Sequence, residues 1–474
     1  MIAPWAKEEM ETADFRDERL DGRMVTLLSA LGERPNLSIP AACKGRAEME
    51  AAYRFFANDK VTFEKVLEPH RARTRERMAR EKVVLMVQDT TEADVTRPEQ
   101  QVKGAGVLDG PRRGFLLHEM QAFTPAGIPL GTVWAEVLNR SEVSHASKAE
   151  KFRKQQHTPI EEKESMRWLD GLRQARAVAQ ELPETQCVCV ADSEADIYEL
   201  FAEPRGEKPL EWLIRACRNR ALEGEEAHLH AQVLATPVLY ELKLGVRARQ
   251  AKTAAETRKR RVDRAAREAT VEVRASTLTL RPSRRHDREL PPVTVNVVLV
   301  SEVNPPADEP PIEWILLTTL PIGTLDEVRT IVSYYCVRWS IEVFFRTLKS
   351  GCRIEERRFE DMERLLPCAA LYLIVAWRTL FVCHMSRNCP ELDCEAIFEP
   401  CEWKAVWATV KGEPTPESPP SLSVMVHLIA QLGGYIERKK SEPGPQTIWI
   451  GMQRMYDLAW AWERFGPEAR LRSS

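Results

Sequence analysis

The sequence predicts a mixed α/β fold with helical regions at both ends, and three changes of pattern along the chain indicate this. Buried-strand patterns alternate with helical patterns over residues 76–216, which is typical of an α/β sheet. Residues 217–323 alternate apolar and polar side chains as β-strands do. Apolar residues at helical spacing dominate residues 1–75 and the chain from residue 324 onward. We therefore expect five segments, with boundaries at 1–75, 76–216, 217–323, 324–385 and 386–474.

The overall charge of the 474-residue chain is close to balanced. Lys and Arg number 68 against 71 Asp and Glu, so the formal net charge is −3, and 43% of the residues are apolar. This composition excludes a uniformly basic, histone-like protein and an acidic disordered chain. A nucleic-acid partner would have to be bound by local basic patches, and residues 247–267 supply one, with nine Lys or Arg against two acids.

The N-terminus and the cysteines predict a cytoplasmic protein with reduced thiols. Residues 1–15 carry acids where a signal peptide needs an apolar core, and the eleven cysteines form no paired framework. The apolar segment 365–383 contains Arg378, and a central Arg costs about 2.5–3.5 kcal/mol on membrane insertion. We interpret this segment as a buried core helix, with a membrane span as the less favoured alternative.

The C-terminal segment shows scattered cysteines and one clear helix. Five potential metal ligands lack the paired Cys-x2-Cys spacing of a zinc site, so structural thiols are favoured over zinc for Cys383, His384, Cys389, Cys394 and Cys401. Beyond residue 385 we expect irregular structure and a Pro-rich linker at 411–421. A final helix is predicted at 446–465.

The first 75 residues read as a bundle of short helices. Residues 17–31 place Leu and Met side chains on one face, while Arg19 and Arg23 lie on the other side. A second helix is predicted at 46–56. Such a bundle is either a packing module or a small DNA-binding headpiece, and the local pattern does not decide between them.

Two acids follow predicted buried strands. The run 83–87 ends at Asp89, and the run 187–191 ends at Asp192, so we expect both acids at the C-terminal ends of strands. An acid after a strand is weak evidence alone, because capping of a following helix explains many. The remaining elements expected before residue 217 are strands at 114–124, 130–136 and 212–216 and a helix at 148–181.

A single long helix is predicted from Thr324 to Gly351. It begins with a capping box at residues 324–327, and Gly351 is a plausible stop. At 100° per residue, one narrow stripe opposite an apolar face contains Tyr335, Arg338, Glu342 and Lys349. A solvated charged face is the alternative, but here an acid is flanked by two cations and a phenol. We interpret the stripe as a carboxylate held beside phosphate groups.

Three carboxylates on this scaffold predict magnesium chemistry. Asp89, Asp192 and Glu342 offer the hard oxygen ligands that Mg²⁺ prefers. Two such ions, about 3.5–4 Å apart, would activate the attacking oxygen and stabilise the leaving one in phosphoryl transfer. The sequence has no G-x4-G-K-[ST] motif, so ATP-driven chemistry has no support.

Motifs in order along the chain resemble those of the insertion-sequence-four family of transposases, typified by the transposase of transposon five. The most specific is Y-x2-R-x3-E-x6-K, which begins at Tyr335 and ends at Lys349. The other matching segments are A-x-YRF near Ala52–Phe55, QDTT at 88–91, EKES at 162–165, ADSEADIY at 191–198 and EWILLTTLP at 313–321. The resemblance implies an RNase H-like catalytic core with a β-strand insertion at 217–323, a DNA-binding segment at 1–75 and a dimerisation region at 386–474.

The resemblance also implies roles for individual residues. Asp89, Asp192 and Glu342 would be the catalytic ligands of two Mg²⁺ ions, for which Mn²⁺ substitutes. DNA phosphates at the cleavage site would be gripped by Tyr335, Arg338 and Lys349. Arg19 and Arg23 would contact the transposon end, and Arg215 would lie near the active site. Trp314 would stack on a base flipped out of the duplex, whereas its plain interpretation is a core aromatic on a strand.

The implied activity is cut-and-paste transposition by a homodimer that holds two transposon ends and a target DNA, without a membrane partner or ATP. A nicked end would form a hairpin, the hairpin would be reopened, and the end would be joined to the target. Two alternatives remain. One is an RNase H-like nuclease that only hydrolyses DNA. The other is a non-catalytic DNA-binding inhibitor, which arises in this family when the headpiece is missing, and the presence of residues 1–75 and of all three acids disfavours it.

Overall fold

The computed structural model describes residues 2–43, 45–140, 158–206, 210–224, 228–246, 265–282, 289–307, 309–437 and 442–467. The chain divides into two compact units. The first comprises Met1–His145, Glu181–Thr185 and Trp339–Ser474, and the second comprises Ala146–Gln180 and Gln186–Arg338.

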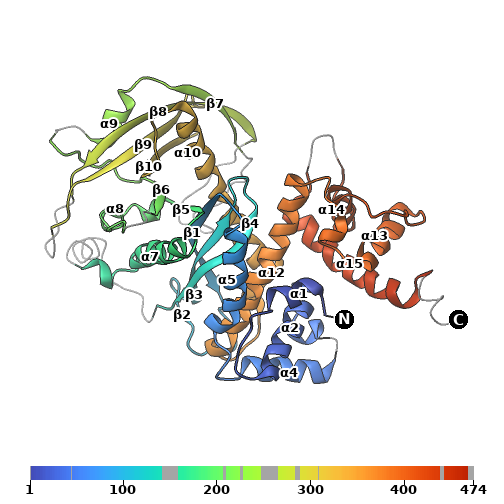
Figure 1. Ribbon diagram of the computed structural model, residues 1–474. Helices are drawn as coiled ribbons and strands as arrows, with labels where there is room; N and C mark the ends of the chain where they lie inside the picture. The colour runs from blue at the N-terminus through green and yellow to red at the C-terminus, as the bar shows by residue number, and fades with distance from the viewer. Residues whose placement is uncertain are drawn as a thin grey trace. The chain divides into compact units, whose positions relative to one another are not determined.

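Short helices open the first unit, as predicted (blue in Figure 1). α2 follows its N-cap Asp17, whose side chain accepts a hydrogen bond from the Arg19 amide, and its apolar face buries Met24, Leu27 and Leu28. The helices of this region are α1 (Pro4–Glu9), α2 (Glu18–Glu33), α3 (Ile39–Ala42), α4 (Arg46–Phe56) and α5 (Phe63–Met78).

The sheet of the first unit is antiparallel. β3 (Arg113–Phe123) pairs with β1 (Val83–Asp94) along one edge, and with β2 (Gly106–Val107) and β4 (Pro129–Leu138) along the other. The prediction that the first strand ends at Asp89 is wrong. Asp89 stands opposite Glu119, and the pairing with β3 carries β1 on to Asp94. β1 is longer than predicted because it pairs with the long strand β3, which the sequence around Asp89 does not indicate.

α12 (Met362–Asn388, orange in Figure 1) is the central helix of the first unit, and it packs against α5 and β4. In the part of the chain that the structure describes, it is the one helix long and apolar enough to cross a membrane, but its most apolar stretch is largely buried. The Trp377 indole donates a hydrogen bond to the Pro129 carbonyl at 3.0 Å, and Arg378 donates one to the Ile397 carbonyl at 2.9 Å. The predicted buried core helix is confirmed.

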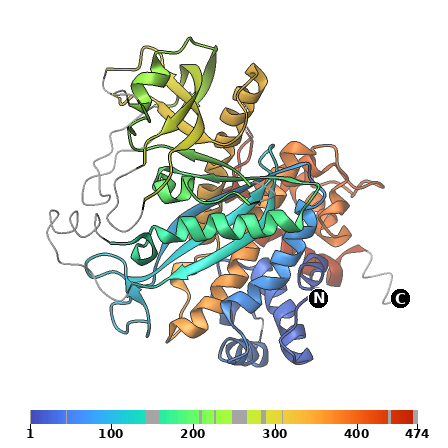
Figure 2. The same ribbon diagram turned by 60° about the vertical axis from the view of Figure 1, so that its left-hand side comes forward.

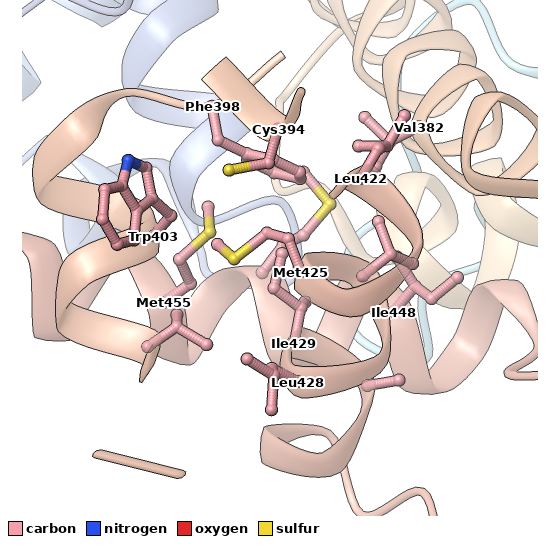
Figure 3. Packing of buried hydrophobic residues seen from close by; sticks show 14 of the residues in the cluster. Val382, Cys394, Phe398, Trp403, Leu422, Met425, Leu428, Ile429, Ile448 and Met455 are labelled. Carbon is pink, nitrogen blue, oxygen red and sulfur yellow. The ribbon is translucent and has the colours of Figure 1, made fainter. Parts of the chain in front are cut away.

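The C-terminal region is more helical than predicted. α12 continues to Asn388, and two helices that we did not expect, α13 (Pro400–Lys411) and α14 (Leu422–Leu432), precede the expected α15 (Pro445–Phe465). Figure 3 shows how side chains from these helices converge into one apolar cluster, which includes Trp403, Met425 and Met455. Cys383 and Cys394 are buried in the same cluster. Helix formation here depends on tertiary packing rather than on a strong local pattern.

The sheet of the second unit contains the strands predicted for residues 187–323, in the order β5-β6-β10-β9-β8-β7. β5 and β6 are parallel, and the other pairs are antiparallel. The strands are β5 (Gln186–Ala191), β6 (Glu211–Arg215), β7 (Tyr240–Val246), β8 (Arg267–Leu280), β9 (Val293–Glu302) and β10 (Glu313–Thr318). Because β10 pairs with β6, the strands expected as an insertion continue the sheet that begins with β5.

Helices accompany this sheet. α9 (Leu229–Leu234) packs on β8 and β9, and α10 (Leu325–Val337) packs on β9, as Figures 1 and 2 show. The short α8 (Tyr198–Phe201) follows β5, and α7 (Met166–Glu181) precedes it. Within the described part of the predicted helix at 148–181, residues 158–181, the α-helix begins only at Met166, because Pro159 and a single 3₁₀ turn at Ile160–Glu162 come before α7. Residues 148–157 and most of the basic run, 247–264, lie outside the described residues.

The predicted continuous helix from Thr324 to Gly351 is interrupted. Its capping box is confirmed, with the Glu327 amide donating to the Thr324 hydroxyl and the Thr324 amide to the Glu327 carboxylate. α10 ends before Arg338. The Arg338 amide donates to the carbonyl three residues back, that of Tyr335, at 3.1 Å, instead of to the carbonyl four residues back as in an α-helix. α11 (Trp339–Arg346) follows, and a π-helical turn closes the segment at Thr347–Gly351. A projection at 100° per residue therefore does not hold along the whole segment.

Both units mix helices and strands, which confirms the predicted α/β class with helical regions at each end. The architecture is consistent with an RNase H-like core. The five predicted segment boundaries remain a prediction.

Candidate active site

The C-terminal ends of the parallel strands β5 and β6 carry two of the predicted site residues. Asp192 follows β5 and caps a short 3₁₀ helix, and its Oδ1 accepts a hydrogen bond from the Glu194 amide at 2.8 Å. Arg215 is the last residue of β6, and its Nη2 donates to the Ser193 hydroxyl at 3.2 Å. Because neighbouring parallel strands end at the same edge of a sheet, the acid and the cation lie on adjacent turns.

Three more predicted site residues join this edge, from β10, from α10 and from the residue that follows α10. β10 pairs Leu316 with Arg215, so Trp314 lies just beyond the end of β6. The ring centroids of Trp314 and Tyr335 are 5.6 Å apart, and the Arg338 guanidinium lies 5.9 Å from the centre of the Tyr335 ring. The second unit thus gathers five of the ten predicted site residues.

Tyr335 and Arg338 are buried, which differs from the exposed stripe that the helical projection predicted. The side chains are 0% and 4% exposed. Burial raises the pKa of Tyr335, nearby Arg215 and Arg338 lower it, and Asp192 raises it. The net pKa is above the ordinary value, so the phenol is protonated at neutral pH and is a hydrogen-bond donor.

The first unit holds Asp89, Glu342 and Lys349. The Asp89 Oδ1 accepts a hydrogen bond from the Thr90 amide at 2.7 Å, and α11, which carries the exposed Glu342, packs against β1. Lys349 lies in the π-helical turn, with its Nζ 3.6 Å from a carboxylate oxygen of Glu355. Glu355 also accepts the Asp94 amide at 3.0 Å, so Lys349 is linked to the end of β1.

The three predicted metal ligands are drawn from both units. Asp89 and Glu342 belong to the first unit and Asp192 to the second. Within either unit, the residues that the structure describes include no group of three or more His, Cys, Asp or Glu side chains that could hold a metal ion. The donor set itself suits a hard divalent cation, because it consists of carboxylates and the Glu194 amide orients one of them.

Three family models match the chain in order. A transposase DNA-binding model matches residues 2–61, a transposase DDE domain model matches 167–374, and a transposase Tn5 dimerisation domain model matches 374–461. The chain is a Tn5-like transposase of the insertion-sequence-four family. The transposase is therefore a DDE enzyme, a metal-dependent DNA endonuclease and strand transferase. It binds DNA through its N-terminal region and forms dimers through its C-terminal region.

The match to the DDE domain contains Asp192 and Glu342, whereas Asp89 lies before its first matched residue. Membership of this family carries a dependence on divalent metal ions. The DNA-binding match contains Arg19 and Arg23 on α2. Arg19 is exposed and pairs with Asp17 at 3.1 Å, and Arg23 lines a surface pocket of about 350 Å³ on the headpiece.

Sequence reasoning missed Glu119 of the transposase, which stands opposite Asp89 on β3. Its side chain is fully buried, and its Oε1 accepts hydrogen bonds from the Thr132 hydroxyl at 2.8 Å and the Gln121 amide at 2.9 Å. Burial raises the pKa of Glu119 to about 8, although the two hydrogen bonds lower it. The available signal was the polar series His118, Glu119 and Gln121 within an otherwise apolar strand.

Proposed function

We propose that this transposase catalyses cut-and-paste transposition, with Asp89, Asp192 and Glu342 as ligands of two Mg²⁺ ions for which Mn²⁺ can substitute. The observation that carries the proposal is the meeting of Asp192 with Arg215 and the Trp314–Tyr335 pair at one sheet edge of the second unit. When bound, the ions would supply Lewis-acid stabilisation of the attacking and leaving oxygens.

The side chains around Asp192 have distinct tasks in this proposal. Arg215 and Arg338 carry positive charge that binds phosphate oxygens, and Lys349 does the same from the first unit. Tyr335 stays protonated at neutral pH, because burial raises its pKa, and it donates a hydrogen bond to a phosphate oxygen. Such preorganised donors and charges favour the transition state of phosphoryl transfer.

The proposed reaction is a series of exchanges at phosphorus. Water first hydrolyses one strand at the transposon end and leaves a 3′-hydroxyl. That hydroxyl attacks the opposite strand and forms a hairpin, a second water opens the hairpin, and the freed 3′-hydroxyl attacks the target DNA. Each strand-joining step replaces one phosphodiester bond with another, so it needs no nucleotide cofactor. This agrees with the lack of a P-loop motif in the sequence.

The proposed working form is a homodimer that holds two transposon ends in a synaptic complex. The headpiece contacts the duplex of each end through Arg19, which is exposed on α2, and through Arg23, which lines a pocket together with the buried Leu27 and so does not lie opposite the apolar face as the helical pattern predicted. We place this activity in the cytoplasm, on chromosomal DNA.

The experiment that tests the proposal begins with the selection of bound duplexes by gel shift, followed by Mg²⁺-dependent cleavage of the selected DNA. Asp192→Asn should bind the selected end normally and lose nicking, because metal ligation is not needed to hold the duplex. Glu194→Gln is the matched control, since Glu194 is an exposed acid on the same turn. Asp192→Asn that nicks at the wild-type rate would refute the ligand assignment.

Strand-transfer assays on pre-cut ends separate the proposal from its rivals. A transposase joins the 3′-hydroxyl end to a target plasmid. A nuclease that only hydrolyses DNA yields nicks without joined products, and a non-catalytic inhibitor binds the end and yields neither.

A further inference from the structure

Asp196 is a buried acid four residues after Asp192 in the second unit, and its side chain is 0% exposed. One carboxylate oxygen accepts hydrogen bonds from the backbone amides of Cys217 and Arg218, at 2.8 and 2.9 Å. The other accepts from Nε and Nη2 of Arg220, and the Nε distance is 2.9 Å. A carboxylate has about four acceptor positions, so these four N–H groups occupy all of them.

Arg220 is itself held on several sides. Its Nη2 also donates to the backbone carbonyl of Asp196 at 2.9 Å, and its guanidinium lies 5.1 Å from the centre of the Phe201 ring and 5.7 Å from that of Tyr198. The Tyr198 hydroxyl in turn donates to the backbone carbonyls of Leu280 and Pro291. The ion pair is therefore anchored in the core of the second unit.

The two turns that this ion pair joins are the turns that carry site residues. Asp196 closes the 3₁₀ helix that Asp192 begins. Cys217 and Arg218 follow Arg215 by two and three residues, at the point where the chain leaves β6. One carboxylate thus links the turn after β5 to the turn after β6.

We infer that Asp196 and Arg220 form a clamp that positions Asp192 and Arg215 for catalysis and that Asp196 does not ligate the metal. This inference rests on the proposed function, because it assigns the clamp to the same site. Ligation of a metal by Asp196 would require the loss of hydrogen bonds to Arg220 or to the two amides. The clamp instead acts on the orientation of groups that touch metal and DNA, as outer-shell partners do.

Asp196→Asn tests the clamp. The amide group replaces one acceptor oxygen with a donor, which then faces either the guanidinium or the two backbone N–H groups. We expect faster hydrogen exchange in the segment 216–220, unchanged binding of the end duplex, and a loss of about 10- to 100-fold in nicking rate and in Mn²⁺ affinity of the DNA complex. Calorimetric titration with Mn²⁺ gives the affinity without reference to turnover.

Two further variants keep the test decisive if Asp196→Asn is poorly folded. Arg220→Lys retains the charge but loses the two-pronged contact, so it should show a smaller loss of Mn²⁺ affinity. The double variant Asp196→Asn with Arg220→Gln removes both buried charges, which should restore the melting temperature without restoring nicking. If nicking returns together with the melting temperature, the pair is only structural and the inference is overturned.

The matched control is Glu194→Gln, because the Glu194 side chain is 62% exposed on the same turn and pairs with Arg167 away from the clamp. It should keep wild-type exchange, Mn²⁺ affinity and nicking. Comparison with Asp192→Asn separates this inference from the proposed function. An inactive Asp192→Asn beside a fully active, folded Asp196→Asn overturns the clamp alone, whereas an active Asp192→Asn overturns the ligand assignment on which the clamp rests.

Discussion

Trp314 is either a structural aromatic of the sheet edge or a side chain that stacks on a DNA base, and the two roles predict different mutant phenotypes. Its ring is only half-buried and packs against Tyr335 at the edge of the sheet that also carries Asp192. Hairpin formation joins opposite strands across a duplex, which requires a tight backbone bend that extrusion of a base relieves. An aromatic ring that stacks on the extruded base returns about 1–3 kcal/mol of the unstacking cost.

Trp314→Ala should therefore nick the first strand almost normally and form few hairpins, and Trp314→Phe should recover part of the hairpin yield. Denaturing gels resolve the two products, and 2-aminopurine placed near the end reports base flipping by its fluorescence. A parallel loss of folding and of both steps would assign Trp314 to the core instead.

Glu9 is a buried acid whose surroundings predict how the stability of the protein depends on pH. It is buried against His70, at 2.5 Å, and against Arg77, at 3.0 Å, and so attaches α1 to α5. Burial alone would raise the pKa of Glu9, but His70 and Arg77 outweigh it and lower the pKa to about 2. Burial also lowers the pKa of His70, whose Nε2 accepts the Thr132 amide. Both shifts make the folded state bind fewer protons than the unfolded state in acid.

Stability should therefore fall as the pH drops, first below 6.5 through His70 and then from 4.5 toward 2 through Glu9. Glu9→Gln should cost on the order of 3 kcal/mol at pH 7, because it leaves a buried cation poorly paired. The difference from wild type should shrink below pH 4.5 in urea unfolding experiments. Glu8→Gln is the control, since the Glu8 carboxylate, which pairs with Arg73, is exposed to solvent. Equal effects of the two substitutions would contradict the argument.

At the level of elements, the helix and strand ends that depend on nearby residues can be predicted from the sequence, whereas those that depend on tertiary contacts cannot. The Thr324 capping box and the strands that end at Ala191 and Arg215 follow from short sequence patterns, and so the positions of Asp192 and Arg215 were predictable. The extension of β1 past Asp89 depends on its pairing with β3, from Thr90 opposite His118 to Asp94 opposite Gly114. The break at Arg338 coincides with the boundary between the two units, which no helical pattern encodes.

The contacts within the site likewise depend on tertiary structure that the local sequence does not encode. The Trp314–Tyr335 contact joins a strand to a helix, and the Asp196–Arg220 pair joins two turns 24 residues apart. Both depend on register and on packing. The family resemblance indicated Trp314 and Tyr335, whereas no sequence pattern indicated that Arg220 would pair with Asp196. Glu119 was missed because the polar series His118, Glu119 and Gln121 does not by itself show that these side chains are buried.

The charged residues of the segment from α10 to the π-helical turn give a prediction at this scale. If Arg338 and Lys349 each contact a DNA phosphate, Arg338→Ala and Lys349→Ala should each weaken binding of cleaved ends and reduce the slope of log K against log[salt] by about 0.9. Arg329→Ala is the control, because Arg329 is an exposed α10 residue paired with Asp326. Unchanged slopes would return Arg338 and Lys349 to a purely structural interpretation.

The contact between α14 and α15 requires a glycine at position 451. A Cβ at Gly451 would lie 1.8 Å from the Ile429 carbonyl oxygen, so the two helices meet through backbone. Gly451→Ala should separate them and destabilise the C-terminal cluster by about 1–3 kcal/mol. Gly444→Ala is the control, since a Cβ there meets nothing within 4 Å. Thermal unfolding measures both, and equal melting temperatures would exclude a close backbone contact.

At the scale of the whole molecule, α15 has to serve both the protomer and the dimer. Its buried face supplies Ile448, Met452 and Met455 to the apolar cluster of the first unit, so that face is not available to a partner. Its exposed side carries Trp460, which is 46% exposed and lies under the Arg464 guanidinium at 3.8 Å. Aromatic and Arg side chains are the residue types that dominate binding energy at protein interfaces. We therefore expect the dimer contact to include this side of α15.

Trp460→Ala should leave binding of a single end intact and weaken paired-end complexes by roughly 30-fold, the loss typical of a central interface aromatic. Double-strand cleavage should fall with the paired complexes at low protein concentration and recover when the concentration is raised, because the active sites are unchanged. Gln446→Ala, at an exposed position near the start of the same helix, should pair ends normally. Gel shifts with two DNA ends of different length count the paired complexes directly. Normal pairing by Trp460→Ala, or efficient cutting of a lone end by a monomer, would show that assembly does not proceed through this face.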